Sequence, residues 1–180
     1  KEMINSIVNK KAVEWVVASS VEKPAIILKL FEYSYSPDKK LAFHSSWVLT
    51  KVCDKYPEII YPYLTDMIAT LGSIDNESAL RSLLRIISLA DTVRINSSMH
   101  GVLADFCFNI LKSGSYTIAV KAYSMEILYR LSLIYPELAT ELSVSIMILM
   151  EDGSAGITSR GRMILKKLAV IPISPKSSHL

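Results

Sequence analysis

Apolar residues recur at intervals of three and four along almost the whole chain, and no segment shows sustained apolar–polar alternation. The first spacing places side chains on one face of an α-helix, whereas alternation is typical of a β-strand. The pattern therefore predicts an all-α fold with eight or nine helices. The first two are expected at about residues 3–18 and 24–33, and the last at about 158–170. Between them, Ser36-Pro37-Asp38 is expected to open a helix, and Asn76 is expected to cap another.

The breaks between helices repeat along the chain. Tyr56-Pro57-Glu58 returns 79 residues later as Tyr135-Pro136-Glu137, and glycine is followed by serine at positions 72, 114 and 153, which are 42 and 39 residues apart. Each of these glycines is expected just past a helix, in the left-handed conformation that glycine adopts without strain. The repeating unit is therefore about 40 residues: helix A, a tight break, helix B and a Gly-Ser turn.

This organisation resembles the HEAT and armadillo-type α-solenoids, including the HEAT-like fold of bacterial alkylpurine DNA glycosylases. The resemblance implies a right-handed α-α superhelix of about four to five helix pairs. It also implies a single domain over residues 1–171, with a flexible tail over residues 172–180. One helix pair cannot bury its own apolar face, so neighbouring pairs stack to share a core. The alternative is a generic helical bundle whose breaks repeat by chance.

The composition fits a globular chain of 180 residues, with 51% hydrophobic and 21% charged residues and a mean hydropathy of +0.32. A membrane helix needs about 20 consecutive apolar residues, but the longest candidate, 144–150, is interrupted by Ser145 and followed by Glu151. We therefore expect no membrane contact and assign the apolar excess to helix seams.

Cys53 and Cys107 have neither disulfide nor metal spacing. Their apolar neighbours favour small core residues in a reducing compartment, which we expect to be the cytoplasm.

No catalytic motif or cofactor motif occurs in the sequence. His44, His100 and His179 are scattered, and none has a metal-ligating residue three or four positions away. A phosphate-binding glycine loop, a G-x-S-x-G elbow and an H-E-x-x-H pair are also missing. We therefore expect polar surface histidines, no cofactor, no metal and no enzymatic activity.

Trp47 and Asp54 test the comparison with DNA glycosylases of similar fold, which use aromatic residues and an aspartate in a cationic groove. The two residues are seven positions apart and share a helix face. They lie in a helix of the A type, however, whereas such grooves are lined mainly by the opposite row. We therefore favour Trp47 as a core or seam residue and Asp54 as a solvated one.

Charge separates the two rows of helices, because the A helices sum to a positive charge and the B helices to a negative one. B helices normally line the concave face of a HEAT array, so this face is expected to be weakly acidic and unsuited to phosphates. A basic patch is expected in the last helix, where it either meets an acidic partner or nucleic acid or, as we favour, forms the solvated cap of the array. Its members are Arg160, Arg162, Lys166 and Lys167.

The leading hypothesis is a non-enzymatic scaffold that binds a protein or peptide on its concave face. The candidate contact residues are Tyr61, Asp66, Asp105, Phe108, Asn109, Lys112 and Glu141. Phe108 would supply apolar anchorage and the acids would select a basic or polar ligand, although Phe108 fits a seam between repeats equally well. The rival hypothesis is a HEAT-like DNA-binding or alkylpurine DNA glycosylase-type protein, and homo-oligomerisation is compatible with either.

Overall fold

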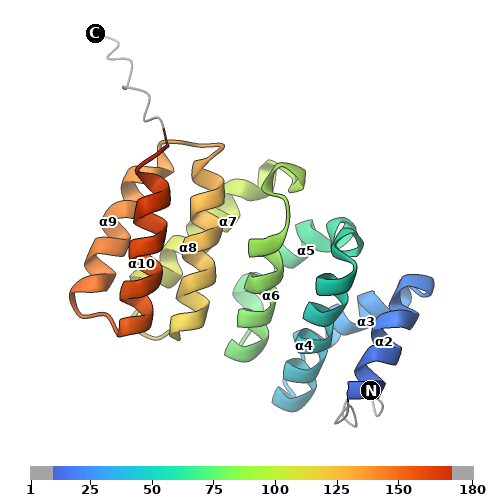
Figure 1. Cartoon of the computed structure of the whole chain (residues 1–180). Helices are drawn as coiled ribbons and strands as arrows, with labels where there is room; N and C mark the ends of the chain where they lie inside the picture. Colours follow the sequence, from blue (N-terminus) through green and yellow to red (C-terminus); the bar gives the residue numbers. More distant parts are fainter. Residues whose placement is uncertain (1–9, 172–180) are drawn as a thin grey trace. The chain divides into compact units, whose positions relative to one another are not determined.

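The computed structural model describes residues 10–171, and this part of the chain contains helices joined by turns and no strand (Figure 1). The prediction of an all-α fold is confirmed. The α-helices are α2 (Lys10–Glu22), α3 (Ala25–Ser34), α4 (Lys39–Lys55), α5 (Leu64–Ala69), α6 (Glu77–Leu89), α7 (Ser98–Lys112), α8 (Ile118–Ser132), α9 (Leu138–Glu151) and α10 (Ala155–Leu168). The described residues also contain three short 3-10 helices, which are η1 (Pro57–Tyr63), η2 (Leu71–Ser73) and η3 (Thr92–Arg94).

The chain divides into two compact units, residues 1–102 and 103–180, and α7 runs from the first into the second. In the first unit, α4 packs against α2, α3, η1 and α6. Its side chains Val48, Leu49 and Val52 are completely buried. A helix with neighbours on several sides is what stacked helix pairs require, because each pair shares its core with the next.

In the second unit, α8, α9 and α10 pack against one another. Gly161 of α10 lies so close to α9 that an added Cβ would come within 2.7 Å of Met150 Sδ and 2.9 Å of Ile146 Cγ2. The helix following a pair thus packs on both members of that pair. The prediction of one domain over residues 1–171 stays a prediction, and the tail at residues 172–180 lies outside the described residues.

The helix starts predicted at Ser36-Pro37-Asp38 and at Asn76 are confirmed, and Asp38 and Asn76 are the caps. The Asp38 carboxylate accepts hydrogen bonds from the amides of Lys40 and Leu41, at 3.0 and 3.2 Å. The Asn76 side-chain oxygen accepts from the Ala79 amide at 3.1 Å. Both caps satisfy amides that have no acceptor within the helix.

Three details of the predicted helices differ from the structure. The B helix expected after Tyr56 is divided into η1 and the short α5, since Pro62 lies inside the segment and cannot donate a backbone hydrogen bond. The last helix begins at Ala155 rather than Thr158, with Ser154 as its cap. The start of the first predicted helix lies outside the described residues, and the helix continues to Glu22.

The left-handed glycines were predicted wrongly, because no glycine among residues 10–171 has a positive φ. Gly72 instead lies inside η2. At Gly153 the requirement is steric: an added Cβ would collide with the backbone oxygen of Leu149 and come within 2.9 Å of Ile157 Cγ2. This glycine is needed for close packing between α9 and α10 and not for its backbone freedom.

Candidate functional site

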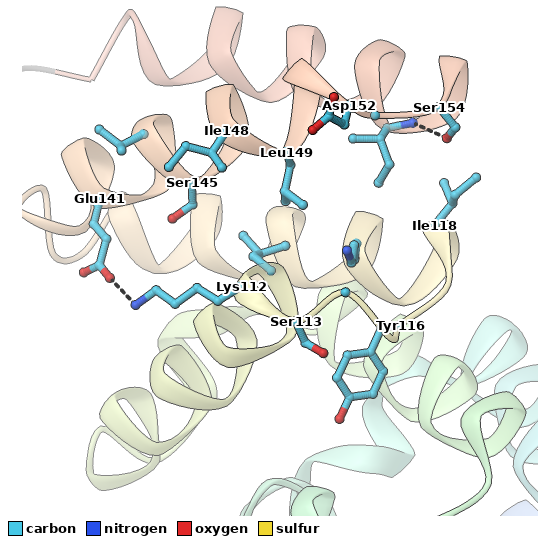
Figure 2. Close-up of a pocket in the computed structure, with 16 residues that line it drawn as sticks. Lys112, Ser113, Tyr116, Ile118, Glu141, Ser145, Ile148, Leu149, Asp152 and Ser154 are labelled. Atoms are coloured by element: carbon cyan, nitrogen blue, oxygen red, sulfur yellow. Dashed lines mark hydrogen bonds and ion pairs between the residues drawn. The ribbon is translucent and has the colours of Figure 1, made fainter.

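A cavity of about 750 Å³ in the second unit lies beside α9, the end of α7 and the starts of α8 and α10 (Figure 2). This volume lies within the range of ordinary ligand sites. The residues that line it are Leu111, Lys112, Ser113, Gly114, Tyr116, Ile118, Lys121, Glu141, Val144, Ser145, Ile148, Leu149, Asp152, Gly153, Ser154 and Ile157.

The apolar wall of this cavity is unusually open to solvent. Ile118 is 45% exposed, Val144 is 47% exposed and Ile148 is 61% exposed. Val144 and Ile148 are four residues apart on α9 and therefore share one face of that helix. An exposed apolar strip beside a cavity is typical of a surface that another molecule covers.

Lys121 is the one charged residue among those lining the cavity that is also buried, with 9% of its surface exposed. No carboxylate of residues 10–171 lies within ion-pair distance of its ammonium group, and no hydrogen bond joins that group to the rest of the described chain. Lys121 lies one helical turn before Met125 and two before Leu128, both completely buried. Its stem therefore belongs to the buried face of α8 while its side chain lines the cavity.

Two helix N-termini meet at one end of the cavity. Ile118 begins α8, and an added Cβ at Gly156 in the first turn of α10 would lie 3.1 Å from Ile118 Cγ2. Ser154 caps α10 by accepting a hydrogen bond from the Ile157 amide at 3.5 Å. Figure 2 shows Ile118 and Ser154 at this end and the Lys112–Glu141 pair at the other. Helix N-termini favour negative charge.

The structure brings together two of the predicted contact residues across neighbouring B helices. Lys112 Nζ on α7 lies 3.1 Å from Glu141 Oε1 on α9, and both side chains are more than half exposed. Asp105 and Asn109 of α7 are exposed as predicted. Of the two interpretations of Phe108, the structure favours the packing residue over the exposed anchor, because it is only 5% exposed and its ring lies beneath Lys112. Phe108 is therefore a packing residue of the second unit.

The two candidates in the first unit differ in their surroundings. Asp66 is exposed on α5. The Tyr61 hydroxyl accepts a hydrogen bond from the Asp91 amide at 2.9 Å, and the Arg94 guanidinium lies 3.5 Å from the Tyr61 ring centroid. Tyr61 thus joins η1 to η3, and its polar group already has an internal partner.

The predicted basic patch is divided between two environments. Arg162 and Lys166 are exposed, in agreement with a solvated helix face. Arg160 and Lys167 instead face Glu126 on α8, which also contacts Arg130. Two of the four residues of the predicted basic patch therefore form ion pairs that hold α10 against α8.

The residues weighed for catalysis are also placed by the structure. Trp47 is 37% exposed, so it is not a core residue. Asp54 lies 2.8 Å from Arg85 and 3.7 Å from Lys51, so two cations neutralise it. His100 is buried, with Nε2 3.1 Å from the Ile95 carbonyl, which corrects its predicted surface location. His44 is half-buried.

Two further findings concern residues 10–171. This segment has no helix with both the length and the apolar character needed to cross a membrane. It also has no cluster of three or more histidine, cysteine, aspartate or glutamate side chains that could hold a metal ion.

Lys121, Ile118 and Ile148 are the site residues that sequence reasoning missed. A usable signal was present for Lys121, which occupies the apolar stripe of α8 together with Met125 and Leu128. A lysine in such a stripe buries the methylene groups of its side chain, and its ammonium group must reach water or a charged partner. For Ile118 and Ile148, the sequence offers no distinction between burial in a seam and exposure in a cavity.

Comparison with known proteins identifies a family for most of the chain. A family model described as a HEAT repeat domain matches residues 1–168. Neither the curated proteins nor the solved structures include a significant match. The helix pairs of the structure and this match over most of the sequence lead to one conclusion: the chain belongs to the HEAT repeat family.

Proposed function

We propose that this protein is a non-enzymatic scaffold that holds a protein or peptide segment on the concave face that its B helices are expected to line. In the second unit, the binding surface is the cavity beside α7 and α9. HEAT repeats commonly mediate protein interactions, and the proposal gives this general role a location on the chain.

The observation that supports the proposal is the open apolar wall of the cavity. Ile118, Val144 and Ile148 have between 45% and 61% of their surface exposed, beside a space of about 750 Å³. Covering apolar surface stabilises a complex by roughly 25 cal/mol per Å² before the costs of association are counted. A peptide segment that runs along this space would cover apolar surface of all three residues.

The test is selection of peptides from a displayed random library with the purified full chain, followed by affinity measurement on synthetic peptides. Ile148→Asp places a charge on the cavity wall and is expected to weaken binding at least tenfold. Met147→Asp is the matched control, because Met147 is the adjacent residue of α9, is 51% exposed and does not line the cavity. Circular dichroism checks that both variants are folded.

Two results would contradict the proposal. One is failure of the library to yield any peptide that binds, and the other is equal weakening by the two variants. Titration with duplex DNA over a salt series tests the rival function. Affinity that falls steeply with salt would favour nucleic-acid binding, since released counterions dominate that interaction.

A further inference from the structure

We infer that the cavity of the second unit binds the C-terminal end of a partner peptide, with the free α-carboxylate on Lys121 and an apolar last side chain against α9. This inference rests on the proposed function and specifies the ligand chemistry. Two independent observations support it: an unpartnered, buried lysine that lines the cavity, and the paired N-termini of α8 and α10 at one end of it.

Lys121 supplies the positive charge for this interaction. It is nine-tenths buried and lines the cavity, and its ammonium group has no ion pair or hydrogen bond within the described chain. Its stem is buried, while its ammonium group stays within reach of solvent in the cavity, where it can meet a bound anion. A hydrogen bond between an ammonium group and a carboxylate is stronger than one between neutral groups.

The other charged residues that line the cavity are either paired with each other or exposed to solvent. Lys112 and Glu141 neutralise each other at 3.1 Å. Asp152 follows α9 and is exposed to solvent, so water screens its charge. Of the two lysines that line the cavity, Lys121 is therefore the one without an ion pair among the described residues.

The two helix starts favour the same sign of charge. The first amides of a helix have no acceptor within it and point outward along the helix axis, where they attract anions. Ile118 at the start of α8 lies beside Gly156 in the first turn of α10, so both helix ends act on one region. A carboxylate there would meet two helix dipoles and one ammonium group.

The combination of a cation with an apolar wall favours a chain end. The Lys112–Glu141 pair lies at one end of the cavity, and the starts of α8 and α10 lie at the other (Figure 2). The last residue of a peptide carries a carboxylate and a side chain on the same Cα. One residue would therefore supply both the anion for Lys121 and the apolar group for the exposed wall formed by Val144 and Ile148.

The experiment uses the full chain and fluorescein-labelled hexapeptides that end in Leu, Ile, Val or Phe, each prepared as the free acid and as the amide. Fluorescence polarisation is expected to show binding of the acids that is at least tenfold tighter than that of the amides. Lys121→Met removes the charge, keeps the apolar stem and should abolish this preference. Lys166→Met is the matched control, since Lys166 is exposed on α10 and does not line the cavity.

Each outcome decides between the two proposals. Equal binding of acids and amides, or a preference that survives in Lys121→Met, would overturn the inference and leave the scaffold proposal standing. Binding of amidated peptides with an internal Asp or Glu, lost in Lys121→Met, would overturn the chain-end assignment. Failure of every hexapeptide here and of the displayed library would overturn both. Unfolding curves of the two methionine variants are expected to match that of the unmodified chain, and a less stable Lys121→Met would count for a packing role.

Discussion

Glu126 on α8 is the common partner of three cations, and its removal should destabilise the second unit. Its carboxylate lies 3.2 Å from Lys167 Nζ, 3.6 Å from Arg130 Nε and 3.7 Å from an Arg160 amino group. The side chain of Glu126 is only 15% exposed, whereas its partners are 28–38% exposed. One shielded negative charge therefore holds the cations of α10 against α8.

The substitution Glu126→Gln retains the size and the hydrogen-bonding oxygen of the side chain while removing its charge. A hydrogen bond to a charged group contributes roughly 1.5–3 kcal/mol, and breaking a fully buried ion pair costs about 3–5 kcal/mol. The cations here are partly solvated, so water screens some of the loss. We expect the free energy of unfolding to fall by about 2 kcal/mol.

Urea unfolding followed by circular dichroism measures this change, and Glu32→Gln is the control. The Lys29–Glu32 pair is shorter, at 2.6 Å, but both of its side chains are more than half exposed. Exposed pairs contribute roughly 0–1 kcal/mol, so the control should change stability by less than about 0.5 kcal/mol. Equal losses in the two variants would refute the argument that burial, and not distance, determines the contribution.

Three further predictions concern packing, capping and pH. Gly153→Ala should lower the free energy of unfolding by about 1–3 kcal/mol, whereas Gly114→Ala, which has open space around its Cβ, should be nearly neutral in the same urea assay. Asn76→Ala should cost about 1 kcal/mol or more because α6 loses its cap and Nδ2 no longer donates to the Lys39 carbonyl, whereas Asn76→Asp keeps the cap alone and should lose less. Burial raises the pKa of Tyr35 from 10.0 to about 12. Above pH 10 the unfolded chain therefore binds fewer protons at this residue, stability falls toward pH 12, and Tyr35→Phe should weaken that dependence.

Local signals predicted the helices well. Asp38 and Asn76 mark helix starts correctly because a cap acts on amides two or three residues away. Pro62 was missed as a break because the apolar spacing continues across it, although the missing amide hydrogen divides the helix into η1 and α5. The glycine at position 153 was recognised as special for the wrong reason, since its requirement is a close contact with the backbone of α9 before it and with Ile157 of α10 after it.

The candidate site depended on contacts that spacing does not encode. Glu126 meets Lys167 across 41 residues of sequence, so a helix-by-helix sum of charge treats both as solvated. Phe108 and Ile148 are both apolar residues of B helices, yet one is buried and the other is 61% exposed. The difference arises from how far apart neighbouring helices lie, which the sequence of either helix alone does not reveal.

The two cysteines lie in different units, Cys53 in the first and Cys107 in the second. Burial raises the pKa of each thiol to about 12, with the charge of Asp54 adding to the effect at Cys53. Since the thiolate is the reactive form, alkylation of the completely buried Cys107 near neutral pH requires a local opening that exposes the sulfur, whereas Cys53 is only partly buried. The rate of Cys107 alkylation thus reports opening of the second unit, and a peptide seated beside α9 would slow it while leaving modification of Cys53 unchanged.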